Sequence, residues 1–141
     1  MRRFVIDANV LASGSVEPQS ESPPSVLYRE LTGTLFEAVV CAELLAEVAE
    51  ALGKPYFSNR VGAEEAADIV TGIAEAATVL DDPLDPPAIL RDAEDDYLVA
   101  LARQGGVEAI ITGDKDLIDE PNLDPPAIGP RQACKVLGLL D

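Results

Sequence analysis

The sequence predicts an α/β domain in which a mostly parallel sheet carries helices on both faces. Short runs of β-branched and apolar residues alternate with longer segments of helical periodicity. This order is typical of parallel sheets built from strand–helix–strand units. The chain has 141 residues, 48% of them hydrophobic, which is enough for a substantial core. We therefore expect one domain over residues 1–141.

Five segments are expected to form strands. Residues 3–6 (RFVI) are predicted to be the central strand, and residues 109–112 (AIIT) a second buried strand. Residues 35–41 and 78–80 supply two more, and Ile128 lies in a small edge strand. In open α/β sheets ligands bind outside the carboxyl ends of the strands, so the residues that follow these runs are the first candidates for a site.

Helical periodicity is clearest at residues 42–52, where apolar side chains form one stripe. The helix that follows the acidic residues near position 92 is apolar around most of its circumference, so it should lie in the interior. The remaining helices are expected at residues 24 to about 31, 63–77 and 131–140. Three segments with many proline or acidic residues are expected to be irregular: 13–24, 81–87 and 119–126. The residues from Pro55 to Phe57 should end the clearest helix.

Composition excludes several kinds of chemistry. The chain contains no histidine, which removes Ser-His-Asp and Cys-His catalysis and the usual zinc sites. Cys41 and Cys134 lack a Cys-x-x-Cys spacing and are expected to be buried small hydrophobic residues. The amino-terminal residues lack an apolar signal region and no apolar run has spanning length, so the protein is expected to be cytoplasmic, with no membrane partner.

The net charge of −16 bears on the partners of the protein. Acidic residues number 26 and basic residues 10, and such a surface repels nucleic acid at low salt, because phosphate binding rests on Lys and Arg. Either nucleic acid is not the partner, or the protein works in high salt, where repulsion is screened. Scarce lysine with abundant acid and alanine suggests a salt-adapted host.

Acidic residues stand where a site is expected. Asp7 follows the first predicted strand, and Asp114 and Asp116 follow the strand at 109–112. On the helix at 42–52, Glu47 lies nearest the edge of the apolar stripe, whereas Glu43 and Glu50 point further toward solvent. Three more acids stand together at the entrance of the interior helix: Asp92, Asp95 and Asp96.

Two interpretations of these acids are open. Asp and Glu are favoured in the first turn of any helix, where they cap free N–H groups, and Gly113-Asp114 resembles a turn. Alternatively, four carboxylates that meet in one cleft would repel one another and require a cation. Mg²⁺ or Mn²⁺ takes such oxygen ligands, and a metal-activated water could attack a phosphodiester.

Four stretches, in this order, resemble the PIN-domain family: VIDANVL, ELLAEVAEALGKPYF, RDAEDDYLVALA and IITGDKDL. Within that family the sequence is most similar to toxins of prokaryotic toxin–antitoxin pairs. The resemblance implies a five-stranded parallel sheet with an acidic pocket and an endoribonuclease that depends on Mg²⁺ or Mn²⁺. It also implies an RNA substrate, an antitoxin protein as partner and a homodimer.

The resemblance assigns the metal-binding and catalytic acids as Asp7, Glu47, Asp96 and Asp114, with Asp96 preferred over Asp95. Residues that match further family positions are Asp92, Asp95, Asp116, Thr112 and Asn9. The chain departs from the family at Ala8, where Thr or Ser is frequent, and in having few basic residues to place around the pocket.

Other functions remain open at this stage. A housekeeping RNA-processing nuclease of the same fold would carry the same residues. A non-catalytic acidic binding module could retain the fold, although all four expected acids are present. A phosphatase-like or receiver-like domain also gathers aspartates at strand ends, but Lys115 follows Asp114 rather than a later strand.

Overall fold

The computed structural model describes residues 1–84 and 96–140, and its centre is a five-stranded parallel sheet. The strands are β1 (Arg2–Ile6), β2 (Phe36–Val40), β3 (Thr78–Val79), β4 (Ala109–Ile111) and β5 (Ala127–Ile128). Their order across the sheet is β3-β2-β1-β4-β5, and every neighbouring pair is parallel. The predicted α/β class and the central position of the first strand are confirmed.

Backbone hydrogen bonds extend the pairing by one residue beyond the ends of two strands. The Asp7 N–H donates to the Ile111 carbonyl at 2.8 Å, and the Thr112 N–H donates to the Ile128 carbonyl at 2.9 Å. Phe4, Val5 and Ile6 are buried, as expected for a parallel strand covered on both faces. The ladder therefore fixes where the chain leaves β1 and β4, which is where the acidic residues begin.

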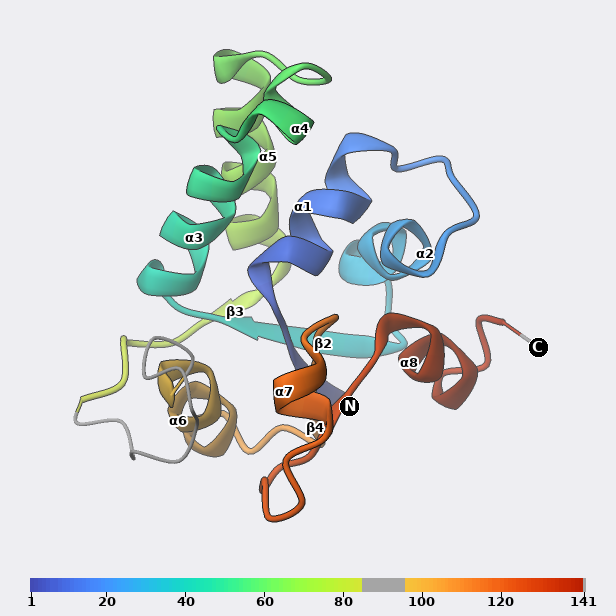
Figure 1. Cartoon of the computed structure of the whole chain (residues 1–141), viewed down its shortest axis with the longest axis vertical. Coiled ribbons are helices and arrows are strands. Elements are labelled where there is room, and N and C mark those ends of the chain that lie inside the picture. Colours follow the sequence, from blue (N-terminus) through green and yellow to red (C-terminus); the bar gives the residue numbers. More distant parts are fainter. Residues whose placement is uncertain (85–95, 141) are drawn as a thin grey trace.

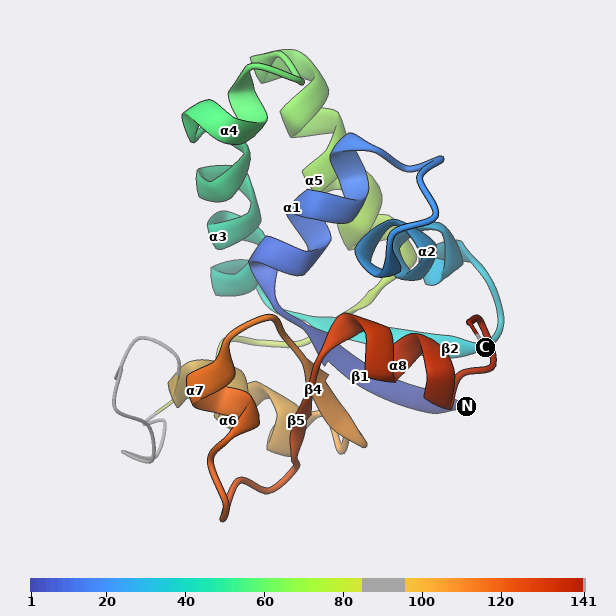
Figure 2. The ribbon, with the colours of Figure 1, turned by 45° about the vertical axis from the view of Figure 1, so that its right-hand side comes forward.

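Helices cover both faces of the sheet, as predicted (Figures 1 and 2). On one side lie α1 (Ala8–Val16), α2 (Pro23–Arg29), α3 (Ala42–Leu52) and α5 (Ala63–Ala76), and on the other lies α6 (Asp96–Gln104). A 3₁₀ turn (Glu30–Thr32) follows α2, and the short helices are α4 (Pro55–Ser58), α7 (Lys115–Ile118) and α8 (Pro130–Val136).

The predicted bounds of the surface loop at residues 13–24 are wrong at both ends. The first helix continues to Val16, and α2 already begins at Pro23. Gly14 allows this packing, because a Cβ at that position would come within 2.3 Å of the Pro24 carbonyl oxygen. A glycine that suggests a break in the sequence is therefore a point of close approach between α1 and α2.

Two helix ends also differ from expectation. The last helix ends at Val136 rather than Leu140, because Gly138 has a φ of +75° and the Leu139 N–H turns back to the Cys134 carbonyl at 2.8 Å. Residues 55–58, expected only to end a helix, form the short α4. The boundaries at 42–52 are as predicted.

The core confirms two further predictions. In α6 the residues Tyr97, Leu98, Val99, Leu101 and Ala102 are buried, so this helix is interior. Cys41 and Cys134 are both buried and free. Within the described residues, no helix combines the length and apolar character needed to cross a lipid bilayer.

Candidate functional site

Asp7 is held in place at the carboxyl end of the central strand. Its Oδ2 accepts a hydrogen bond from the Thr112 hydroxyl at 2.7 Å, and its Oδ1 accepts one from the Ala8 N–H at 2.7 Å. Thr112 is fully buried at the end of β4, which pairs directly with β1. Two neighbouring strands thus orient one carboxylate.

Thr112 also connects Asp7 to Asp114. The Thr112 hydroxyl oxygen accepts the Asp114 N–H at 3.1 Å while its own hydrogen goes to Asp7. Asp114 caps α7, since its Oδ1 accepts the Asp116 N–H at 2.9 Å. The capping interpretation is therefore correct for one oxygen of Asp114. Capping does not explain why this carboxylate lies close enough to Asp7 for its charge to act there.

The electrostatics of Asp7 reflect burial and a like charge. Burial raises its pKa above the ordinary aspartate value, hydrogen bonds from Thr112 and Ala8 oppose that rise, and the charge of Asp114 adds to it. In this environment the ionised form of Asp7 is less favourable than in water.

Glu47 approaches the same place from α3. It is half-buried, whereas Glu43 and Glu50 are exposed, as the helical wheel predicts. Burial raises the pKa of Glu47, the nearby Tyr97 hydroxyl acts to lower it, and the negative charges of Asp7, Glu43 and Glu50 raise it further. A cleft of about 460 Å³ beside it is lined by Ala8, Asn9, Glu43, Glu47, Glu50, Ala51 and Lys54.

The beginning of α6 completes the surroundings. Asp96, the first residue of that helix, is only 4% exposed. Its neighbour Tyr97 has a buried hydroxyl that makes no hydrogen bond of normal distance and angle among the described residues. The carboxylate of Glu47 is nonetheless near enough to raise the pKa of that hydroxyl beyond the effect of burial, and Cys41 and Asp7 contribute as well.

The structure thus brings only some of the predicted site residues close to one another. The charge of Asp114 raises the pKa of Asp7, and the charge of Asp7 raises the pKa of Glu47. Thr112 hydrogen-bonds to both Asp7 and Asp114. Asn9 lines the adjoining cleft, and the Asp116 side chain is exposed. Asp92 and Asp95 lie outside the described residues.

A divalent cation fits the chemistry of this donor set. Carboxylate oxygens are the ligands that Mg²⁺ and Mn²⁺ prefer, and in the part of the chain that the structure describes none of Asp7, Glu47 and Asp114 forms an ion pair. The orphaned Tyr97 hydroxyl beside Glu47 is a further sign that the polar surroundings are incomplete. As arranged, no three acidic side chains among residues 1–84 and 96–140 are close enough together to hold an ion.

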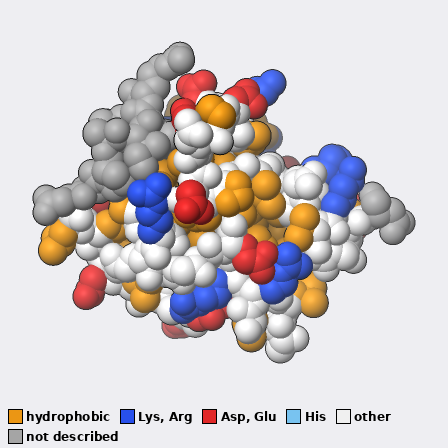
Figure 3. All heavy atoms as spheres, turned by 90° about the horizontal axis from the view of Figure 1, so that it is seen from below, with side chains coloured by type: hydrophobic (Ala, Val, Ile, Leu, Met, Phe, Trp, Pro, Cys, Tyr) orange, Lys and Arg blue, Asp and Glu red, His pale blue; other side chains and the backbone are white. Residues whose placement is uncertain are grey.

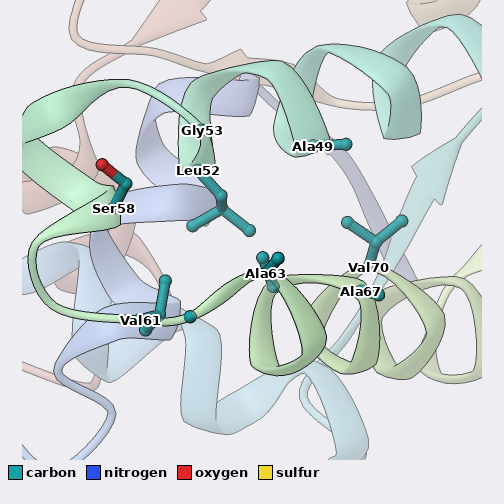
Figure 4. Close-up of a pocket in the computed structure, with 10 residues that line it drawn as sticks. Ala49, Leu52, Gly53, Ser58, Val61, Ala63, Ala67 and Val70 are labelled. Atoms are coloured by element: carbon teal, nitrogen blue, oxygen red, sulfur yellow. The ribbon is translucent and has the colours of Figure 1, made fainter.

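A second concavity offers no comparable chemistry. It has a volume of about 650 Å³ and lies between α3, α4 and α5, where Leu52, Val61 and Val70 point into it together with several alanines (Figure 4). Its lining contains no charged side chain, and Ser58 is its one side chain with a polar group. We therefore place the candidate site at the acidic cleft.

Sequence reasoning did not identify Tyr97 as part of the site. It treated this residue as core, and in burial it is core, at 3% exposure. Two features of the sequence could have pointed to Tyr97. It carries a hydroxyl among the aliphatic residues of this helix, and it directly follows the acidic residues at the start of the helix.

The fold and the acidic cleft together define the class of the protein: a parallel α/β domain with carboxylates gathered at the carboxyl ends of its central strands. The chain belongs to the PIN domain family, whose sequence pattern matches residues 3–116. PIN domains are typically nucleases and generally use divalent metals. No curated protein sequence matches the chain.

Solved structures share the fold. PAE2754 from Pyrobaculum aerophilum matches with a TM-score of 0.65 and 17% identity, over 99% of this chain and 91% of its own. VapBC2 from Rickettsia felis, solved bound to a DNA fragment from their promoter, matches with a TM-score of 0.58 and 11% identity, over 90% of this chain and 98% of the matched chain. At these identities the likeness concerns the fold.

Proposed function

We propose that this protein is a cytoplasmic endoribonuclease that depends on Mg²⁺ or Mn²⁺ and is the toxin of a toxin–antitoxin pair. The observation that carries the proposal lies at the strand ends of a PIN domain, where Asp7 is close enough to Asp114 and to Glu47 for their charges to interact. None of these three acids forms an ion pair among the described residues. Together with Asp96, these are the acids that we assign to metal binding and catalysis.

The proposed mechanism assigns a task to each of these side chains. When bound, the ion supplies positive charge that activates water and stabilises charge developing on the phosphodiester. Asp7 offers an orientation already set by Thr112 and the Ala8 N–H, while Asp114 is positioned by Thr112 and by its cap on α7. Glu47 faces them from α3 and is the acid that approaches from the helix layer.

The raised pKa values of Asp7 and Glu47 suit this role. Both carboxylates hold their protons more tightly than in water because of burial and neighbouring negative charge. Metal and protons compete for these carboxylates, so metal affinity should fall as the pH falls. Once bound, the ion removes the repulsion that raises these pKa values.

RNA as substrate has to be reconciled with the charge of −16. On the face seen in Figure 3, the described Lys and Arg side chains stand singly, several beside acidic ones, and do not merge into one basic patch. Substrate binding at low salt would therefore be weak, and salt should favour it by screening the repulsion between acids and phosphates.

Support for a protein partner comes from the fold and from the site. The VapBC2 structure is of a toxin–antitoxin complex, and a cluster of carboxylates is a ready site for the guanidinium of a partner's arginine. Co-expression with the neighbouring open reading frame should give a stable complex in which cleavage is suppressed. Cleavage without suppression or co-purification would favour a housekeeping RNA-processing nuclease. Gel filtration tests the proposed homodimer.

The experiment that tests the activity is cleavage of mixed RNA substrates at high salt, with Mn²⁺ and with EDTA. We expect cleavage that needs the metal and that is lost in Asp7→Asn. Cleavage that persists in EDTA or in the variant would contradict the proposed function. A protein that binds Mn²⁺ but leaves every RNA intact would support the alternative of a non-catalytic acidic binding module.

A further inference from the structure

The hydroxyl of Tyr97 is a buried polar group without a partner. It makes no hydrogen bond of normal distance and angle among the described residues, although the side chain is only 3% exposed. Buried hydroxyls are usually hydrogen-bonded, because losing water without gaining a partner is unfavourable. Phenylalanine would fill the same space without that penalty, so the packing of α6 does not explain the hydroxyl.

The surroundings of this hydroxyl are acidic. Glu47 has the largest effect of any neighbouring side chain on it, followed by Cys41 and Asp7, and Cys41 is itself a buried free thiol. A tyrosine hydroxyl is a hydrogen-bond donor, and Glu47 offers it a carboxylate acceptor close by.

Glu47 is the carboxylate that lacks support. Asp7 accepts hydrogen bonds from Thr112 and Ala8, and Asp114 accepts one from the Asp116 N–H. The Tyr97 hydroxyl acts on the pKa of Glu47 as a hydrogen-bond donor, but in the part of the chain that the structure describes this contact does not reach normal hydrogen-bond distance and angle. Carboxylates that ligate metals are themselves hydrogen-bonded by outer groups, which fix their orientation.

We propose that Tyr97 is a positioning residue for Glu47, which donates its hydroxyl hydrogen bond to the Glu47 carboxylate when a divalent cation is bound. One oxygen of Glu47 is then held by Tyr97, and the other is free to face the ion. This inference rests on the proposed function and adds to it a residue that touches neither metal nor RNA. It also gives the orphaned hydroxyl a partner in the metal-bound protein.

The test is Mn²⁺ binding by Tyr97→Phe, measured by calorimetry and not only by RNA cleavage. We expect Mn²⁺ affinity to fall by about 10-fold, the lower end of what removal of an outer hydrogen bond to a ligand costs. The melting temperature of the metal-free variant should stay level or rise, because a buried unpaired hydroxyl is removed. Tyr56→Phe is the matched control: Tyr56 is 64% exposed on α4 and should bind Mn²⁺ as the unmodified protein does.

A double-mutant cycle shows whether Tyr97 acts through Glu47. In a Glu47→Gln background, Tyr97→Phe should have little further effect on Mn²⁺ affinity. An equal effect in both backgrounds, unchanged affinity in the single variant, or a metal-free Tyr97→Phe that loses its fold would each overturn the inference. If the unmodified protein itself does not bind Mn²⁺, the proposed function fails together with this inference.

Discussion

Acidic residues have opposite electrostatic surroundings at the two ends of the parallel sheet. At the amino end, Glu108 pairs with Arg2 at 2.8 Å and Glu37 pairs with Arg3 at 3.1 Å. Arg3 also donates to the Gly105 carbonyl at 2.6 Å, and the Thr78 hydroxyl donates to Glu37. Each acid at this end meets an arginine of the central strand.

At the carboxyl end, Asp7 and Asp114 accept hydrogen bonds from hydroxyl or N–H donors, and neither they nor Glu47 form an ion pair in the described part of the chain. The pKa values reflect the difference. The hydrogen bond from Arg2 lowers the pKa of Glu108, whereas burial and like charges raise the pKa values of Asp7 and Glu47. The acids at the amino end are paired with arginines, whereas those at the carboxyl end form no ion pair among the described residues.

The largest expected effect is on RNA cleavage when a carboxyl-end acid loses its charge. We expect each substitution to lower kcat/KM by at least ~10²-fold, because activation of the nucleophile and support of the metal are impaired. The variants are Asp7→Asn, Glu47→Gln, Asp96→Asn and Asp114→Asn. Glu43→Gln and Glu50→Gln, on the exposed side of α3, are the controls. Four variants that unfold more easily while specific activity persists would mean that these acids are caps and hydrogen-bond partners.

A smaller effect is expected on stability at the amino end. Arg3→Met leaves Glu37 with only the Thr78 hydroxyl as donor and removes the arginine donor of the Gly105 carbonyl, which should cost about 1–2 kcal/mol. Arg2→Met, whose ion pair is more exposed, should cost less than Arg3→Met. Urea unfolding measures both. Metal-free Asp7→Asn should instead be at least as stable as the unmodified protein. If it lost as much stability as Arg3→Met, the contrast between the two ends of the sheet would be wrong.

Salt should act on both folding and activity. Screening relieves the mutual repulsion of 26 acidic residues, so molar KCl should stabilise the metal-free protein by about 1 kcal/mol, or roughly 3 °C in melting temperature. RNA cleavage should also improve. Thermal melting and cleavage rates across a KCl series check this, and maximal activity near zero salt would contradict it.

The smallest effect is on the pH dependence of stability without metal. Because the folded-state pKa values of Asp7 and Glu47 are raised, their contribution to stability is present at pH values below the ordinary carboxyl range and is lost as the pH rises through the raised values. Glu108, with a lowered pKa, contributes in the opposite sense, and its contribution is lost as the pH falls. Melting curves from acidic to neutral pH should therefore show a smaller loss with rising pH in Asp7→Asn than in the unmodified protein. Identical slopes would show that Asp7 titrates normally in the folded state.

The sequence by itself determined the class of fold, the central position of the first strand, the helix at 42–52 and the burial of both cysteines. These properties follow from periodicity and local composition, since an apolar stripe indicates the buried face of a helix and a β-branched apolar run indicates a buried strand. The same reasoning separated Glu47 from Glu43 and Glu50, because their angular positions on one helix are fixed by its 3.6-residue repeat.

Only the tertiary structure decided which groups meet. Thr112 and Asp7 are 105 positions apart, and the pairing of β1 with β4 alone brings the hydroxyl to the carboxylate. The close approach at Gly14 depends on where α2 lies. The approach of the Tyr97 hydroxyl to Glu47 depends on where the beginning of α6 lies relative to α3. Periodicity specifies the face of an element, but contacts between elements depend on sheet order and register, which no local pattern encodes.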